Sequence, residues 1–147
     1  MSLQATATFQ FADPESVVRS YIVPRIMAAV DRAEDVVVQE AQSIVPVDTG
    51  ELGASISKDP VIDTGSQVIG IVAARAHHAQ FVEFGTGLRG MGTYPWDLPT
   101  SGVPITSSWQ YDYRRQGWVG MPASPYMRPA IDSGRDRILA CFKDMAL

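Results

Sequence analysis

The residues best suited to chemistry stand together in the segment HHAQFVEFGTG, at positions 77–87. His77 and His78 offer imidazole nitrogens and Glu83 offers a carboxylate, and these groups are typical ligands of a catalytic zinc ion. One interpretation is therefore a small metal-dependent hydrolase that uses His77, His78 and Glu83.

The spacing of these residues argues against that interpretation. Neighbouring side chains point to opposite faces of a strand and do not face each other on a helix, and the chain has only two histidines. No serine, cysteine or second carboxylate stands at a recognisable spacing from Glu83. We therefore expect no metal, no cofactor and no enzyme activity, and the hydrolase remains the alternative from a different class.

A structural role also accounts for the segment. Glu83 stands among aromatic residues and is expected to accept hydrogen bonds from loop backbone amides. Gly85-Thr86-Gly87 lacks the lysine of a phosphate-binding loop, and Gly85 is expected at positive φ. The segment is thus predicted to be a turn and packing motif.

The composition limits the class of function. The chain has 147 residues and a net charge of −4, so it lacks the surplus of lysine and arginine on which non-specific DNA binding rests. Its length suits one domain over residues 1–147. The single cysteine, Cys141, excludes an internal disulfide and is expected to be a small buried hydrophobe. No apolar run reaches the ~20 residues of a membrane span, and the start does not resemble a signal peptide.

Helical patterns lie at both ends of the chain. The first begins with Pro14, and Pro24, which lacks an amide donor, predicts a kink or break before a main helix over 25–45. Pro46 is expected to end this helix. The apolar stripe expected on it consists of Val18, Tyr21, Ile22, Ile26, Val30, Ala33, Val37, Ala41 and Ile44.

The second helix is predicted to begin near Pro129. Gly134 weakens it by about 1 kcal/mol relative to alanine. Its expected apolar stripe consists of Ala130, Ile131, Ile138, Leu139 and Phe142.

Between the helices the sequence predicts a hairpin. Residues 55–62 and 66–74 have strand character, and the turn cluster 63–66 joins them. Residues 79–84 suit either a helical turn or a strand, and residues 87–121, rich in glycine, proline and tryptophan, predict a long irregular insert. The fold class is α+β: a long N-terminal helix and a C-terminal helix packed on a small, mainly antiparallel sheet.

Three short motifs follow one another on this scaffold. The long helix ends in AQSIVPVDTGELGASI, the hairpin is followed by HAQFVEFGT, and the insert is followed by SPYMRPAIDSGRDRI. In this order they resemble the motifs of the small head–tail joining and tail-completion proteins (neck connectors) of long-tailed bacteriophages and prophages. The positions that carry the resemblance are Ala41, Pro46, Thr49, Gly50, Leu52, Ser55, Ile56, Ala79, Val82, Glu83, Phe84, Gly85, Thr86, Pro122, Pro125, Tyr126, Met127, Arg128, Pro129 and Ala130.

Two residues and the insert depart from the family pattern. Gly53 stands where the family usually has arginine, and His78 stands where it usually has tyrosine. The insert over 87–121 is long. These departures bear on the detailed contacts and the partner more than on the fold.

The resemblance implies a structural protein of virion assembly. Members of the family are thought to form rings at the neck, where the tail meets the portal-bearing head. It therefore implies self-association in a ring, expected to be sixfold on its template, with other phage neck and tail proteins as partners. DNA would be only passing cargo, for which an acidic channel wall is suitable, and no membrane is involved. The protein would act in the host cytoplasm during assembly and then in the virion neck or tail.

Two surfaces are expected to make the contacts of the ring. One is the aromatic insert, with Tyr94, Trp96, Trp109, Tyr111 and Trp118. The other is the exposed side of the long helix, with Asp31, Arg32, Glu34, Asp35 and Glu40. A tail terminator or another minor tail protein is the alternative within the same class, because only assembly order separates these roles.

Overall fold

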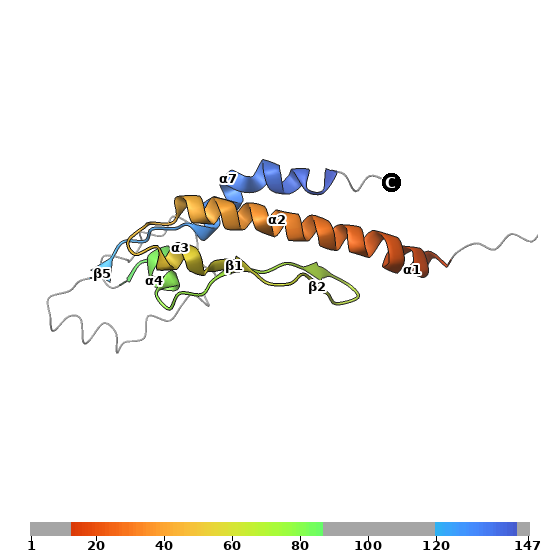
Figure 1. Cartoon of the computed structure of the whole chain (residues 1–147), viewed down its shortest axis with the longest axis horizontal. Coiled ribbons are helices and arrows are strands. Elements are labelled where there is room, and N and C mark those ends of the chain that lie inside the picture. The colour runs from red at the N-terminus through yellow and green to blue at the C-terminus, as the bar shows by residue number, and fades with distance from the viewer. Residues whose placement is uncertain (1–12, 87–119, 144–147) are drawn as a thin grey trace, which may run out of the picture.

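The computed structural model describes residues 13–86 and 120–143 (Figure 1). A long N-terminal helix lies in the middle of this part of the chain. The C-terminal helix α7 (Met127–Ala140) lies along one side of it, and a β-hairpin lies along the other. The predicted α+β class is confirmed. No helix within the described ranges is long and apolar enough to cross a membrane.

The N-terminal helix is continuous. It consists of α1 (Pro14–Val17), the π-helical segment η1 (Val18–Ile22) and α2 (Val23–Ile44). The carboxylate of Asp13 accepts a hydrogen bond from the Ser16 amide at 3.1 Å, which caps the first turn. Beyond α2, Val45 has extended backbone and Pro46 follows, so the helix ends where the sequence predicts.

The irregularity predicted at Pro24 takes the form of a wide helical turn, not a break. The amide of Val23 donates to the carbonyl of Val18, a π-type bond that comes directly before the proline. Because Pro24 cannot donate the next hydrogen bond, a widened turn lets the helix continue past it.

The buried face of α2 differs from the predicted stripe. Of that stripe only Ala41 is fully buried, whereas Val37 is half-buried and Ile44 is exposed. The helix packs against α7 on one side and the hairpin on the other, so its burial is spread over two faces. The buried residues of α2 are Ala29, Glu34, Val36 and Ala41.

The predicted hairpin consists of two short antiparallel pairs. β1 (Ile56–Lys58) pairs with β4 (Val72–Ala74), and β2 (Ile62–Asp63) pairs with β3 (Val68–Ile69). At the tip, the Asp63 carboxylate accepts from the Gly65 amide at 2.7 Å, and Gly65 has a φ of 88°. The turn is therefore where the sequence predicts it.

Shorter elements complete the fold. α3 (Glu51–Ser55) follows Gly50, whose φ is 82°. α4 (Ala79–Phe84) shows that residues 79–84 are helical. β5 (Gly120–Met121) contacts the segment after α4 through a bridge between Thr86 and Met121.

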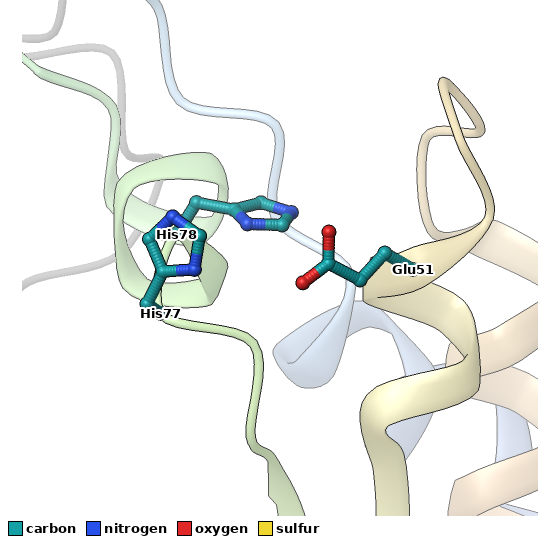
Figure 2. A group of neighbouring side chains, drawn as sticks. All are labelled: Glu51, His77 and His78. Atoms are coloured by element: carbon teal, nitrogen blue, oxygen red, sulfur yellow. The ribbon is translucent and has the colours of Figure 1, made fainter.

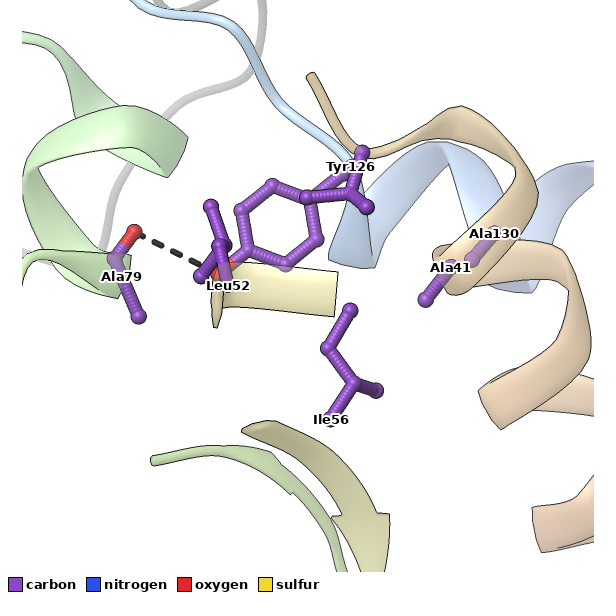
Figure 3. Close-up of a cluster of buried hydrophobic side chains, with 7 residues drawn as sticks. Ala41, Leu52, Ile56, Ala79, Tyr126 and Ala130 are labelled. Carbon is purple, nitrogen blue, oxygen red and sulfur yellow. Dashed lines mark hydrogen bonds between the residues drawn. The ribbon is translucent and has the colours of Figure 1, made fainter. Parts of the chain in front are cut away.

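The core lies where α2, α3, β1, α4 and the start of α7 meet (Figure 3). Tyr126 is its largest side chain and is 1% exposed. The buried core residues are Ala41, Val45, Leu52, Ile56, Ala79, Tyr126 and Ala130.

Small residues bring α7 close to α2. Ala130 and Gly134 are buried, and a Cβ added to Gly134 would lie 3.2 Å from both the Val36 Cγ1 and the Glu40 Cγ. The absence of a side chain at Gly134 therefore permits the close packing of α7 on α2. α7 begins two residues before the predicted Pro129.

The stripe predicted on the C-terminal helix is partly wrong. Ile131 and Leu139 are exposed, because Ala130 and Gly134 form the contact face in their place. Cys141 is half-buried instead of buried, and its thiol donates to the carbonyl of Arg137 at 3.3 Å.

Candidate functional site

The three motifs meet at one end of the molecule, around Tyr126. This residue belongs to the third motif and shares a core cluster with Leu52 of the first and Ala79 of the second (Figure 3). Its hydroxyl donates to the carbonyl of Ala79 at 3.4 Å. Burial raises the pKa of Tyr126 to about 12, and the charge of Glu83 adds to the rise. At neutral pH the hydroxyl is therefore a hydrogen-bond donor and not a base.

Glu83 is the polar centre of this arrangement, as the sequence predicts. Its carboxylate accepts from the backbone amides of Tyr126 at 2.7 Å, Met127 at 3.0 Å and Arg128 at 3.5 Å. These amides begin α7 and have no partner within a helix. Glu83 is itself buried in α4, so it fixes the start of α7 to α4.

The residues after Glu83 form the predicted turn. Gly85 has φ 73° and ψ 174°, a conformation that is essentially restricted to glycine. Thr86 is buried, and its hydroxyl accepts from the Met121 amide at 3.3 Å. The turn therefore joins α4 to β5. Val82 and Phe84 of the same motif are half-buried.

The remaining residues of the third motif flank Tyr126. Pro125 and Pro129 are half-buried, and Arg128 is exposed, with its Nε 3.9 Å from the Asp132 carboxylate. Arg128 therefore lies at the surface on the first turn of α7.

A cleft lies beside this core. Its volume is about 600 Å³, and its walls come from the first motif, from α4 and from the segment after β5. The lining residues are Pro46, Asp48, Thr49, Gly50, Glu51, Leu52, His78, Val82, Met121, Pro122 and Ser124.

The two histidines lie at the edge of this cleft, and their rings are not divergent. The ring centroids of His77 and His78 are 5.0 Å apart in an edge-to-face arrangement. The carboxylate of Glu51 points toward them from α3 (Figure 2), and one ligand atom from each of the three residues lies within 4.8 Å of the other two. The spacing argument against convergence is wrong here because the pair stands in a turn before α4, not in a strand or helix.

The hydrolase alternative built on His77, His78 and Glu83 does not fit this geometry. Glu83 is buried and its oxygens accept backbone amides, so the acid beside the histidines is Glu51. Sequence spacing could not indicate Glu51, because it stands on a different helix, before the hairpin.

The charged side of α2, expected as a ring contact, makes ion pairs with the hairpin and with α7. Lys58 Nζ lies 2.9 Å from the Asp31 carboxylate and 2.7 Å from that of Asp35. Arg137 Nη1 lies 2.7 Å from the Glu40 carboxylate. These pairs hold the hairpin and α7 to opposite sides of α2. The Asp31 and Asp35 side chains remain about half exposed, so the expected exposed face is present except at Glu34, which is buried.

Two further residues of that predicted face differ from each other in their surroundings. Arg32 donates to the carbonyl of Cys141 at 3.0 Å. Glu34 is buried at 5% exposure, and neither of its carboxylate oxygens has a hydrogen-bond partner among the described residues. Its position four residues after Val30, within the apolar repeat, is the sequence signal that could have indicated burial.

Comparison with known proteins agrees with a structural interpretation of the motifs. Residues 22–85 match the family described as "Bacteriophage HK97-gp10, putative tail-component". Over this segment, the chain is similar to a phage tail component. The description names a part of the phage tail. The match holds the first motif and all of the second except Thr86; no curated protein and no solved structure matches the chain.

The matched segment, residues 22–85, includes the first motif, which forms one wall of the cleft. Thr49 and Gly50 belong to the loop after α2, where the Thr49 hydroxyl accepts from the Glu51 amide at 3.4 Å. The predicted aromatic surface of Tyr94, Trp96, Trp109, Tyr111 and Trp118 lies outside the described residues.

Proposed function

We propose that this protein is a head–tail joining or tail-completion protein that forms a ring at the neck of a long-tailed phage. The observation that carries the proposal is the similarity of residues 22–85 to phage tail components. The third motif supports it, because Tyr126 completes the core that Leu52 and Ala79 begin. The motif residues thus hold a scaffold together, as expected of a structural part.

Two exposed apolar surfaces support assembly into a ring. The hairpin surface consists of Ile62, Ile69 and Ile71, and the α7 surface consists of Ile131 and Leu139. Ile62 is 48% exposed and Leu139 is 53% exposed. They belong to elements on opposite sides of α2 (Figure 1). A ring needs two different patches that meet on neighbouring subunits, and this pair satisfies that requirement.

The proposal assigns the aromatic insert to contacts with other phage proteins. Tyrosine and tryptophan are enriched at protein interfaces, where they supply much of the binding energy. Its aromatic residues Tyr94, Trp96, Trp109, Tyr111 and Trp118 are the candidates for contacts with neck and tail partners.

The charge of the chain suits a position beside passing DNA. A net charge of −4 gives weak attraction to phosphates, so DNA would slide through a ring of such subunits without binding. In this proposal the whole chain, 1–147, is one domain, and the insert expected over 87–121 ends earlier, because Gly120 and Met121 form β5. It assembles in the host cytoplasm and stays in the virion neck, and the ring is sixfold.

A tail terminator or another minor tail protein is the second candidate. The matched family is described as a putative tail component, and a place within the tail agrees with that description. Both candidates share the ring and differ in the stage of assembly.

Deletion of the gene from its phage distinguishes the two candidates. A joining protein leaves filled heads and complete tails of normal length, unattached, in electron micrographs of the lysate. A tail terminator leaves tails of abnormal length. Normal joined particles from the deletion would overturn both candidates, and a plasmid copy of the gene is the control that must restore infectious particles.

A further inference from the structure

We propose that Glu51, His77 and His78 form a binding site for a divalent transition metal ion of the zinc type. The site lies at the edge of the cleft and is independent of the ring proposal. It uses residues that the structural role of the motifs leaves free to bind a ligand.

The backbone on both sides of the site is held in place. Glu51 comes directly before Leu52, and His78 comes directly before Ala79; both neighbours are buried in the core. The two segments therefore hold a fixed separation, whereas the Glu51 and His77 side chains are exposed and can adjust. A site needs this combination of rigid support and accessible ligands.

The ligand set selects the class of metal. Two imidazole nitrogens and one carboxylate oxygen are a set that zinc takes in catalytic sites, whereas magnesium and calcium prefer oxygen ligands alone. Imidazole also binds cobalt, nickel and copper, so the site would take these ions as well.

The three ligand atoms would need to move slightly closer together to coordinate one zinc ion. The three ligand atoms lie within 4.8 Å of one another, whereas tetrahedral ligands at zinc distances lie about 3.4 Å apart. Rotation of the exposed Glu51 side chain and of the imidazole rings can close this difference without movement of the core.

Three protein ligands leave one coordination position open. Glu51 and His78 also line the cleft, so a fourth ligand would approach from that side. Water would occupy this position in the isolated metal-bound protein, and a carboxylate or imidazole from a partner could replace it. Metal binding would also connect α3 to the turn before α4.

Titration of the full-length, tag-free protein with Zn²⁺ tests the site by calorimetry, and Co²⁺ serves as a spectroscopic probe. The expected result is one ion per chain, with the visible absorption of Co²⁺ bound to nitrogen and oxygen ligands. Mg²⁺ should not compete.

Single substitutions locate the site. Glu51→Gln, His77→Ala and His78→Ala should each weaken Zn²⁺ binding by at least tenfold, since loss of a ligand costs no less than loss of an outer contact, about 10- to 100-fold. Glu15→Gln, an exposed acid at the far end of the long helix, is the matched control and should bind as the unmodified chain does. Circular dichroism checks that each variant is folded.

Two results would overturn the proposal. One is the absence of saturable Zn²⁺ binding at millimolar concentration. The other is binding that is equally strong in Glu51→Gln, His77→Ala, His78→Ala and the control. If Zn²⁺ does not bind, the ring proposal still stands, because the gene-deletion experiment does not depend on the metal.

Discussion

Glu83 lies in α4 and accepts backbone amides from the start of α7, so a single side chain joins two motifs that are far apart in sequence. Glu83→Ala should lower the free energy of unfolding by about 3 kcal/mol, because it leaves buried amides without an acceptor. Glu83→Gln keeps one side-chain oxygen and should lose less, about 1 kcal/mol. Urea denaturation followed by circular dichroism measures both.

The exposed pair of Glu15 in α1 and Arg19 in η1 provides the control for this test. Glu15→Gln removes an exposed carboxylate that pairs with Arg19, and it should leave the urea midpoint unchanged. Equal midpoints for Glu83→Ala and the unmodified chain would contradict the structural role of Glu83.

Glu34 presents the opposite situation, a buried carboxylate that makes no well-formed hydrogen bond in the described part of the chain, although the Ile71 amide lies near it. Loss of solvation raises its pKa above the ordinary 4.5, and the Ile71 amide and Lys58 oppose the rise only partly. The negative charges of Asp31 and Asp35 raise the pKa further. The folded chain therefore holds this proton at pH values where the unfolded chain has released it.

This proton makes stability depend on pH in a defined direction. The stabilising contribution of Glu34 is complete below pH 4.5 and is lost as pH rises through the higher pKa of the folded state. Glu34→Gln cannot ionise, so it should gain stability relative to the unmodified chain as pH rises from 4.5 to 7.5. Melting temperatures across this range measure the difference. A difference that stays constant with pH would contradict the assignment.

For single residues, the sequence predicts roles that depend on near neighbours in the chain. It does not predict which residues from distant segments come together. Glu83 and Gly85 were predicted correctly because their roles follow from short-range chemistry beside them. The proximity of Glu51 to His77 and His78 could not be predicted, because the hairpin returns the chain to α3 only in the folded protein.

At the scale of elements, the contact between α7 and α2 depends on Gly134. Gly134→Ala gains about 1 kcal/mol of helix propensity, but its Cβ would crowd Val36 and Glu40 at 3.2 Å. Val36 is buried and β-branched, so it cannot easily move. Overpacking of this kind costs about 1–3 kcal/mol, and we expect a net loss of about 1 kcal/mol.

Thermal unfolding of Gly134→Ala checks this expectation. Asp132→Ala, on an exposed position of the same helix, is the control and should be neutral or slightly stabilising. If Gly134→Ala melted at a higher temperature than the unmodified chain, the close approach of the two helices would be wrong.

Propensity and turn chemistry predicted most elements of the fold. The hairpin and its turn at Gly65 were placed correctly, and α2 ends before Pro46. The missing amide donor of Pro24 predicts an irregularity, but it does not predict that the helix continues through a π-helical turn before the proline. The stripe on α2 was misplaced because the helix contacts neighbours on two sides, which a single periodic pattern does not represent.

At the scale of the whole molecule, the account predicts contact between the α7 surface of one subunit and the hairpin surface of the next. Ile131→Ser with Leu139→Ser should leave the melting temperature nearly unchanged, because both side chains are exposed. The same pair should prevent complementation of the deleted gene. Plaque counts with the plasmid-borne variant measure this. Full complementation would exclude the α7 surface from the ring contact.

Cryo-electron microscopy of the purified virion tests the central claim most directly. We expect a closed ring of this protein at the junction of head and tail, with α2 and its hairpin fitting the density of each subunit. Absence of the protein from the particle, or its placement away from that junction, would contradict the account.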